Sequence, residues 1–340
     1  MSRRTWTLLV SLCLATALGL LGALATVPYV ALRPGPTFDT LGVVAGRTVV
    51  DIKGTQTYPT TGHLNMTTVS VVDNVTLYTA LALWMSGHSA LVPRDEIFPP
   101  ELSAQQVEKQ NRQMFQDSEA NAKAAALRYL GYPIAVVAGQ VVAGGAASGK
   151  LVAGDRLLAL DGRELRTAQQ TVDQLAGSHP GQLVRLRFQR GDSPPQEVAI
   201  TLGTGSQPGR GYLGIGLTER PEVPFTVNIT LADVGGPSAG LMFALAIVDK
   251  LTPGALTGNT FVAGTGEIAT DGQVGAIGGI PLKMLRAREA GASVFMVPTE
   301  NCAEAAQRAP DGLRLVRVGT LADAVHALDE IRVGQQPPHC

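Results

Sequence analysis

The stretch GGPSAGLMFALAIVDKL, residues 235–251, contains the features that decide the C-terminal fold. Two glycines and a proline interrupt regular structure, Ser238 follows, and the apolar run after it predicts a buried helix. A serine in front of such a run is the ordinary start of a helix, because its hydroxyl can cap backbone N–H groups. Ser238 is therefore either a helix N-cap or a nucleophile, and a nucleophilic serine needs a base.

The base that the sequence offers for Ser238 is a lysine rather than a histidine. Only His326 lies within the predicted C-terminal fold, on its last helix, and no G-x-S-x-G motif is present. Beyond residue 200 the lysines are Lys250 and Lys283. Lys250 ends the Ser238 helix, about 18 Å away at 1.5 Å per residue, and we expect it to be solvated. Lys283 follows apolar residues and opens its own helix, so desolvation and the helix dipole should lower its pKa.

Three motifs carry a resemblance to a known family over about residues 211–332. They are GGPSAG at 235–240, TGEI at 265–268 and DGQVGAIGGI at 271–280, with a lysine close behind. Together they resemble the proteolytic domain of Lon proteases, which implies an α+β domain of the ribosomal-protein-S5-domain-2-like type. With the N-terminal segments described below, the chain resembles the YlbL-like, PDZ-containing Lon-like serine proteases.

The resemblance implies roles for individual residues. Ser238 would be the nucleophile, Lys283 the general base, and Thr265 a hydrogen-bond partner that holds the lysine. The backbone amides of Gly236 and Ser238 are the candidate oxyanion donors. Many Lon proteases have an acidic residue just before G-P-S, where this chain has glycine. We expect no ATPase domain, no cofactor and no metal site, and the resemblance implies a homo-oligomeric ring.

The N-terminal 32 residues predict a membrane anchor. Arg3 and Arg4 precede a stretch that is uncharged from Thr5 to Leu32, long enough to cross a bilayer as a helix. The positive-inside rule places the N-terminus in the cytoplasm and the body of the protein outside. A cleaved signal peptide is the alternative, because ALA at 23–25 could be a cleavage site.

Residues 33–132 are predicted to form an extracytoplasmic region with strands and a long helix. β-Branched residues over 63–77 indicate a strand, and 77–85 a short helix. Ser103 and Gln106 form a capping box that opens a helix through about residue 130.

Residues 133–202 resemble a PDZ domain, on the motif ASGKLVAGDRLLALDG, with a small β-rich spacer as the alternative. PDZ domains bind an extended peptide in a groove, whose carboxylate loop we expect near residues 136–142. GGAASGKL at 144–151 approaches a P-loop, but Leu151 stands where the Mg²⁺-binding hydroxyl would be. The region is therefore not predicted to bind nucleotide.

The remaining boundaries come from composition and from the resemblance. By composition we expect a linker at 203–210; the resemblance implies a Lon-like domain over 211–335, with a tail at 336–340. We expect an edge strand at 225–231 that could pair with substrate. Asp271 and Gly272 are predicted to form a hairpin turn. Asn301 with Glu304 is a second capping pattern, which predicts the start of a helix. With only three cysteines, we expect no structural disulfide.

The sequence thus predicts a membrane-anchored, ATP-independent serine endopeptidase that cleaves unfolded or extended polypeptides outside the cytoplasm. The alternative is a catalytically inactive, anchored PDZ scaffold that binds client peptides. A formal net charge of -1 gives no basic surface for nucleic acid. A zinc intramembrane protease is excluded because H-E-x-x-H is missing.

Overall fold

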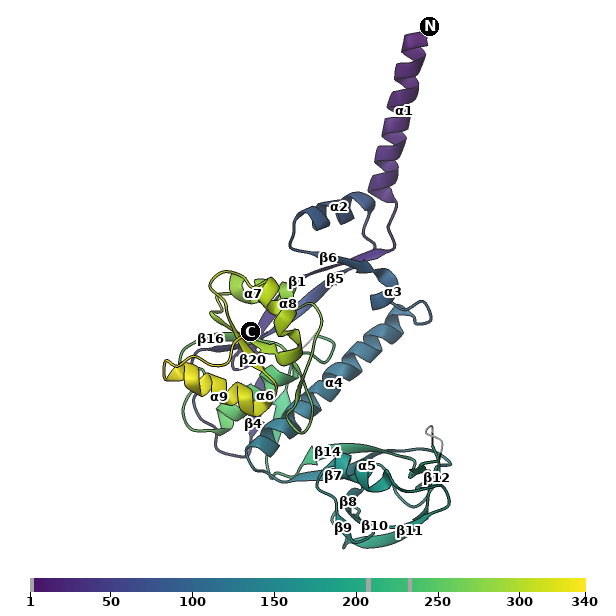
Figure 1. Cartoon of the computed structure of the whole chain (residues 1–340), viewed down its shortest axis with the longest axis vertical. Helices are drawn as coiled ribbons and strands as arrows, with labels where there is room; N and C mark the ends of the chain where they lie inside the picture. Colours follow the sequence, from purple (N-terminus) through teal and green to yellow (C-terminus); the bar gives the residue numbers. More distant parts are fainter. Residues whose placement is uncertain (1–2, 206–208, 232–233) are drawn as a thin grey trace.

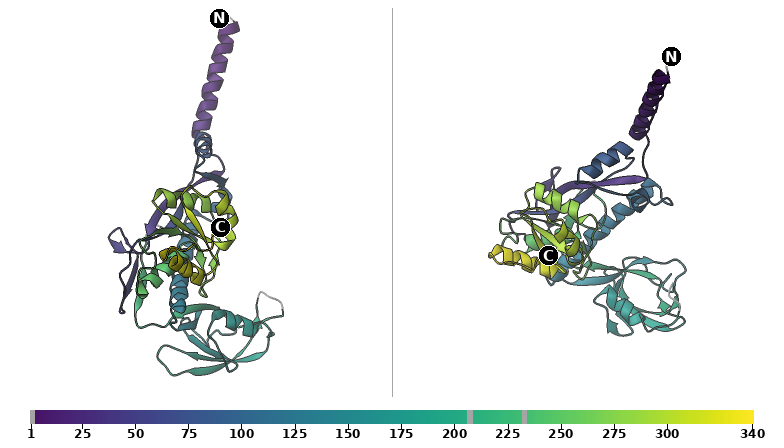
Figure 2. Two further views of the ribbon diagram at one scale, coloured as in Figure 1. Left: turned by 60° about the vertical axis from the view of Figure 1, so that its left-hand side comes forward. Right: turned by 45° about the horizontal axis from the view of Figure 1, so that its top comes forward.

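The computed structural model describes residues 3–205, 209–231 and 234–340, and it has three parts (Figure 1). A single helix, α1 (Arg3–Leu24), projects from one end of the molecule. A mixed α/β body carries the C-terminus, and a smaller β domain lies at the end away from α1 (Figures 1 and 2). Within the described residues, α1 alone is long and apolar enough to span a membrane. The predicted α+β class is confirmed.

The body is built on a six-stranded sheet in the order β20-β19-β16-β5-β1-β6. Its strands are β1 (Tyr29–Asp39), β5 (His63–Val72), β6 (Ala90–Pro93), β16 (Phe261–Gly264), β19 (Val294–Pro298) and β20 (Arg314–Val318). β5, β16, β19 and β20 run parallel, and β1 is antiparallel to both β5 and β6. Because β5 pairs with β16, the regions predicted separately as 33–132 and 211–335 share one sheet.

Helices pack on both faces of this sheet and beside its edge strand β6. They are α2 (Leu77–Met85), α3 (Arg94–Ile97), α4 (Ala104–Tyr129), α6 (Gly240–Leu251), α7 (Ile280–Glu289), α8 (Cys302–Gln307) and α9 (Leu321–Arg332), with a short 3₁₀ turn at Thr299–Asn301. Successive strand residues point to opposite faces. Met296 accordingly packs in the cluster that includes α4, α6 and α9, and its neighbour Phe295 packs in the cluster with α7 and α8.

Two predictions about the long helices are confirmed. The Ser103 hydroxyl accepts from the Gln106 backbone N–H, and the Gln106 side chain accepts from the Ser103 N–H, so the capping box opens α4 as expected. α6 is buried along almost its whole length, with Phe243 packed edge-on against Phe115 of α4 at 5.8 Å between ring centroids. The apolar run after Ser238 is therefore the central helix of the body.

Short strand pairs complete the body. They are β2 (Val43–Val44) with β3 (Arg47–Thr48), β4 (Val50–Lys53) with β15 (Thr226–Ile229), and β17 (Glu267–Ile268) with β18 (Val274–Gly275). The turn predicted at Asp271 and Gly272 joins β17 to β18, and Gly272 has a φ of 90°, where glycine is favoured.

The β domain contains a sheet in the order β11-β10-β8-β7-β14. Its elements are β7 (Ile134–Val141), β8 (Arg156–Leu160), β9 (Arg163–Glu164), α5 (Ala168–Leu175), β10 (Leu183–Gln189), β11 (Gln196–Thr201), β12 (Gly203–Thr204), β13 (Gly211–Tyr212) and β14 (Ile215–Pro221). Since β14 pairs with β7, this domain continues to Pro221 rather than ending at 202. The predicted linker 203–210 contains β12, which pairs with β13; its residues 206–208 lie outside the described part.

The P-loop-like segment is a series of turns between β7 and β8. Leu151 is buried in the β-domain core, and the Lys150 Nζ donates to the Ala199 carbonyl at 2.6 Å. The lysine and leucine therefore support the domain's own packing.

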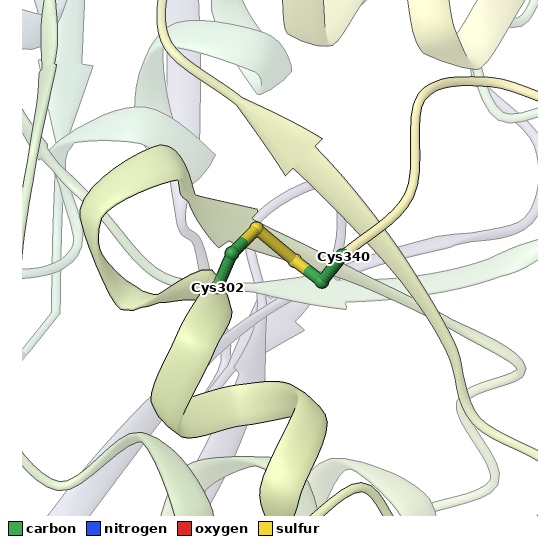
Figure 3. The surroundings of a disulfide bond; sticks show 2 residues. All are labelled: Cys302 and Cys340. Carbon is green, nitrogen blue, oxygen red and sulfur yellow. A yellow bond between two sulfur atoms is a disulfide. The ribbon is translucent and has the colours of Figure 1, made fainter.

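The N- and C-terminal boundaries differ from the prediction. The anchor segment was predicted to reach residue 32, but β1 already begins at Tyr29 and its Leu32 pairs with Val71. At the other end, Cys302 and Cys340 form a disulfide with 5.1 Å between their Cα atoms (Figure 3). The expectation of no structural disulfide was wrong, because a separation of 38 residues gave no sign that the tail returns to α8.

Candidate active site

Ser238 lies in a sharp turn just before the buried helix α6. Gly236 adopts a φ of 85°, Pro237 follows, and Ala239 is the N-cap residue of α6 with no side-chain capping bond. The Ser238 hydroxyl is therefore not used as a helix cap, which was the ordinary structural explanation for a serine at this position. Its side chain is half-buried and reaches the wall of a cleft.

Lys283 approaches Ser238 from the first turn of α7. Its Nζ lies 2.9 Å from the Ser238 Oγ and 3.0 Å from the Thr265 Oγ1, and the side chain is only 3% exposed. Desolvation lowers the pKa of the Lys283 amine from 10.5 to about 8, because burial disfavours the ammonium form. The structure thus brings together the serine, the lysine and the threonine that the sequence singled out.

Thr265 connects the lysine to the turn that carries Ser238. Its hydroxyl donates to the Ser238 carbonyl at 3.0 Å while it accepts from the Lys283 Nζ, and it is fully buried. The Gly266 N–H donates to the same Ser238 carbonyl at 2.9 Å. Because Thr265 uses its proton on the backbone, its lone pair is directed to the amine, which fixes the position of Nζ.

The other lysine considered, Lys250, lies at the far end of α6. Its Nζ donates to the Val50 carbonyl at 2.7 Å, and burial lowers the pKa of its amine. Lys250 is therefore half-buried against β4, and the expectation that it is solvated was wrong.

Helix α4 holds the Ser238 turn in place, a contribution that sequence reasoning missed. The Ser118 hydroxyl donates to the Pro237 carbonyl at 2.8 Å, and the Gly236 N–H donates to the Asn111 carbonyl at 2.9 Å. A Cβ on Gly235 would approach the Asn111 Cβ to 3.0 Å, so α4 leaves little room for the acidic residue that many Lon proteases have before G-P-S.

This arrangement corrects one of the two candidate oxyanion donors. The Gly236 N–H is committed to Asn111 and is not free for a ligand. Within the described part of the chain, the backbone N–H of Ser238 has no acceptor. Of the two candidate oxyanion donors, the Ser238 amide is the one whose N–H remains available.

The cleft beside Ser238 has a volume of about 660 Å³ and is made by both halves of the body. Its lining comes from β1, β5, the 234–239 turn, β17, the segment before α7 and α7 itself. The lining residues are Pro36, Phe38, Met66, Thr68, Val69, Ser70, Val71, Val234, Gly235, Gly236, Pro237, Ser238, Ala239, Glu267, Ala276, Ile277, Gly278 and Lys283. No histidine is among these lining residues. The sequence predicted a strand within residues 63–77, where β5 lies, but nothing in it indicated that this strand forms a wall of the site.

Asn301 fixes the segment that leads into α7. Its side-chain carbonyl accepts from the Ile277 N–H, and its side-chain amide donates to the Ile277 carbonyl, both at 2.9 Å. The predicted capping pattern of Asn301 with Glu304 was therefore wrong, because this side chain bonds Ile277 and makes no cap on α8. Ile277 lines the cleft, so Asn301 shapes the site without reaching it.

A second, apolar groove lies on the β domain, between α5 and β14. It has a volume of about 280 Å³ and is lined by Val172, Leu175, Gly205, Arg210, Gly211, Tyr212, Leu213, Ile215 and Leu217. β14 is the last strand of its sheet, so its outer edge faces this groove. The loop expected near residues 136–142 is instead strand β7 on the other side of β14, and that prediction was wrong.

In the body, the buried amine of Lys283 contacts the hydroxyl of Ser238 beside a cleft. Residues 231–330 match the family described as the Lon protease (S16) C-terminal proteolytic domain. The C-terminal part of this chain is therefore a Lon-type proteolytic domain, as the motifs predicted, and this family is one of serine proteases.

Curated Lon proteases are similar to part of this chain. The chain is 45% identical over 65 residues to Lon protease of Clostridioides difficile (19% of this chain, 8% of that protein). It is 36% identical over 110 residues to Lon protease 2 of Bacillus subtilis (31% and 19%), and 33% identical over 104 residues to Lon protease of Mycolicibacterium smegmatis (31% and 13%). The chain thus spans less than a fifth of the length of each relative.

Solved structures similar to the chain include PDZ domains. The PDZ domain of an SdrC-like protein from Listeria monocytogenes is 25% identical, with a TM-score of 0.23, and the match covers 24% of this chain and 86% of that one. A solution structure of a Geobacillus thermodenitrificans protein is 32% identical, with a TM-score of 0.20, over 21% of this chain and 82% of that one.

Proposed function

We propose that this chain is a membrane-anchored serine endopeptidase in which Ser238 is the nucleophile and Lys283 the general base. The observation that carries the proposal is the 2.9 Å contact between the Lys283 Nζ and the Ser238 Oγ in a buried setting. At pH 7 a pKa of about 8 leaves about a tenth of the amine neutral, about 300-fold more than the ordinary value of 10.5 would allow. The neutral amine is the form that can accept a proton.

In this mechanism the Ser238 Oγ attacks the scissile carbonyl while its proton moves to the Lys283 Nζ. The oxyanion that forms takes a hydrogen bond from the Ser238 backbone amide, at the N-terminal end of α6. Lys283 then returns the proton to the departing amine, which leaves an acyl group on Ser238. Water, deprotonated by the same amine, releases the acyl group and restores the site. Thr265 keeps the Nζ in line throughout, because its own proton stays on the Ser238 carbonyl.

The substrates that suit this cleft are unfolded or extended polypeptides. β5 pairs with β16 only over His63–Met66, so beyond that point its edge on this side carries no partner strand within the described residues. Thr68 to Val71 lie along that stretch and line the cleft, where a substrate strand could add main-chain hydrogen bonds. The edge predicted at 225–231 is less suitable, because β15 pairs with β4 and lines no part of the cleft.

We place the body outside the cytoplasm, with α1 crossing the membrane. α1 is apolar over 22 residues, and Arg3 and Arg4 at its start favour a cytoplasmic N-terminus. The Cys302–Cys340 disulfide also supports a location outside the cytoplasm, because disulfide bonds persist in oxidising compartments. ATP is absent from that environment, so the proposal includes ATP-independent cleavage.

The groove of the β domain would bind peptide segments of a substrate. Its apolar lining suits an added strand, as does the outer edge of β14, which pairs with no other strand among the residues that the structure describes. A homo-oligomeric ring is a further part of the proposal, by analogy with Lon proteases alone.

The test is cleavage of unfolded casein by the full chain in detergent micelles, with and without ATP. The proposal predicts ATP-independent cleavage that is lost in Ser238→Ala and in Lys283→Met. Lys250→Met is the matched control, because it removes a half-buried lysine at the other end of α6, and it should remain active. Equal cleavage by all four proteins would refute the proposal. Peptide binding without cleavage by the wild type would favour the alternative, an inactive scaffold.

A further inference from the structure

Helix α2 presents a large apolar face to solvent. Its sequence, LYTALALWM, contains no charged residue. Leu77, Leu81, Trp84 and Met85 are 52%, 49%, 66% and 73% exposed. Their spacing of four, three and one residues places them on one side of the helix. An uncharged helix with such a face is unusual on a surface that contacts only water.

The structure fixes this helix directly beside the end of α1. The Val27 N–H donates to the Val75 carbonyl at 2.9 Å, and Thr26 forms a β-bridge with Thr76, the N-cap of α2. α2 lies just below the end of α1 and runs across its axis (Figures 1 and 2). Three residues after α1 ends, the chain is therefore hydrogen-bonded to the segment that begins α2.

Tyr78 sets the depth of α2 relative to α1. Its ring lies so close to Gly22 that a Cβ there would be 2.8 Å from the tyrosine Cζ, and its hydroxyl lies 4.0 Å from the same position on Gly19. Gly22 is in the last turn of α1, which ends at Leu24. If α1 spans the bilayer, Tyr78 lies at the height of the outer lipid headgroups, where tyrosine and tryptophan are enriched.

We propose that α2 is a second membrane contact, whose face of Leu77, Leu81, Trp84 and Met85 lies in the outer interface of the bilayer. The proposal rests on the spanning role given to α1 above. It needs no other partner, because the anchor itself brings the apolar face to the lipid. Helices that lie in this interface place leucine and tryptophan on the side that enters the acyl boundary. α2 has these residues on one face, and its Tyr78 and Trp84 are of the two types enriched at this level of the bilayer.

This contact would hold the cleft at a fixed height above the membrane. Four residues separate α2 from the end of β5, whose Thr68 to Val71 line the cleft. Between them, Asp73 accepts two hydrogen bonds from Arg94, both at 2.9 Å, and this ion pair lowers the pKa of the Asp73 carboxyl. The docked body would therefore act on polypeptide segments close to the bilayer surface.

The experiment measures quenching of Trp84 fluorescence by brominated lipids. The full chain carries two tryptophans, Trp6 and Trp84, so Trp6→Phe isolates Trp84 and Trp84→Phe isolates Trp6. Both are placed on a Ser238→Ala background in vesicles of phosphatidylcholine and phosphatidylglycerol. Trp84 should lose most of its emission to bromines near the lipid carbonyls and less to bromines near the chain ends. Trp6 reports insertion of α1, and neither signal depends on proteolysis.

The variants Leu81→Asp and Leu183→Asp separate a lipid contact from a general effect on folding. Leu183 is 60% exposed on the β domain, so its variant should leave Trp84 quenching unchanged, while Leu81→Asp should abolish most of it. Quenching of Trp6 without quenching of Trp84 would overturn the proposal and leave the anchor intact. Unquenched Trp84 with blue-shifted emission would assign the face to a second copy of the chain, which also overturns it.

Discussion

Replacing Lys283 with methionine should stabilise the protein while it abolishes cleavage. The reason is that Lys283 is 3% exposed and carries a pKa of about 8 instead of 10.5. At neutral pH most of the folded molecules hold a buried ammonium group that methionine, of similar length, does not carry. Burial of the Lys283 amine therefore lowers the free energy of unfolding, and the same burial lets the amine lose its proton near neutral pH.

The size of the effect follows from the pKa shift. The difference of 2.5 units, 10.5 minus 8, corresponds to about 3 kcal/mol, since one unit is worth about 1.4 kcal/mol. Below pH 8 both the folded and the unfolded chain hold the proton, and the penalty is complete. Between pH 8 and 10.5 only the unfolded chain keeps it, so wild-type stability rises with pH. Above pH 10.5 the penalty has disappeared.

The assay is urea unfolding of wild type and Lys283→Met in detergent micelles at a series of pH values. The variant should be more stable by about 3 kcal/mol at pH 7, and the difference should shrink as the pH rises through 8 toward 10.5. Lys283→Met being less stable at pH 7, or a difference that does not change with pH, would show that the amine is not held in a desolvated site.

Three further predictions concern the supports of the site. Reducing the disulfide, or replacing Cys340 with serine, should lower the free energy of unfolding by about 4 kcal/mol, because the bond closes a loop between residues 38 apart. Chemical denaturation measures this change, and an unchanged denaturant midpoint of unfolding would count against the bond. Ser118→Ala removes the hydrogen bond to the Pro237 carbonyl, so kcat should fall more than KM rises. The free energy of unfolding should fall by about 1 kcal/mol. Steady-state kinetics that show a change in KM alone would contradict this. Asn301→Ala frees Ile277 in the cleft wall, so KM should rise and stability fall by about 2 kcal/mol, whereas unaltered kinetics would remove Asn301 from the site's support.

The sequence predicted the parts of this molecule that depend on local chemistry. The capping box at Ser103 and Gln106 satisfies backbone groups within one turn, so it could be recognised without knowledge of the fold. The turn at Asp271 and Gly272 is local in the same way. Lys283 was distinguished from Lys250 by its apolar surroundings, and the two amines indeed differ in position, since only that of Lys283 contacts Ser238.

What could not be predicted depends on contacts between distant segments. β5 forms a wall of the cleft because the fold brings it beside the 234–239 turn and the segment before α7, which lie far along the chain. Asn301 looked like a helix cap because that is the commonest local use of asparagine, but Ile277 offers it both a donor and an acceptor. Gly236 was expected to bind an oxyanion, and the carbonyl of Asn111 from α4 takes its N–H instead.

The most direct test of the central claim is the rate at which a serine-reactive fluorophosphonate labels the protein, followed by mass spectrometry across pH. We expect a single adduct on Ser238, a labelling rate that rises with a midpoint near pH 8, and loss of labelling in Lys283→Met. Labelling of another serine, or a Ser238 rate that is the same in Lys283→Met as in the wild type, would contradict it.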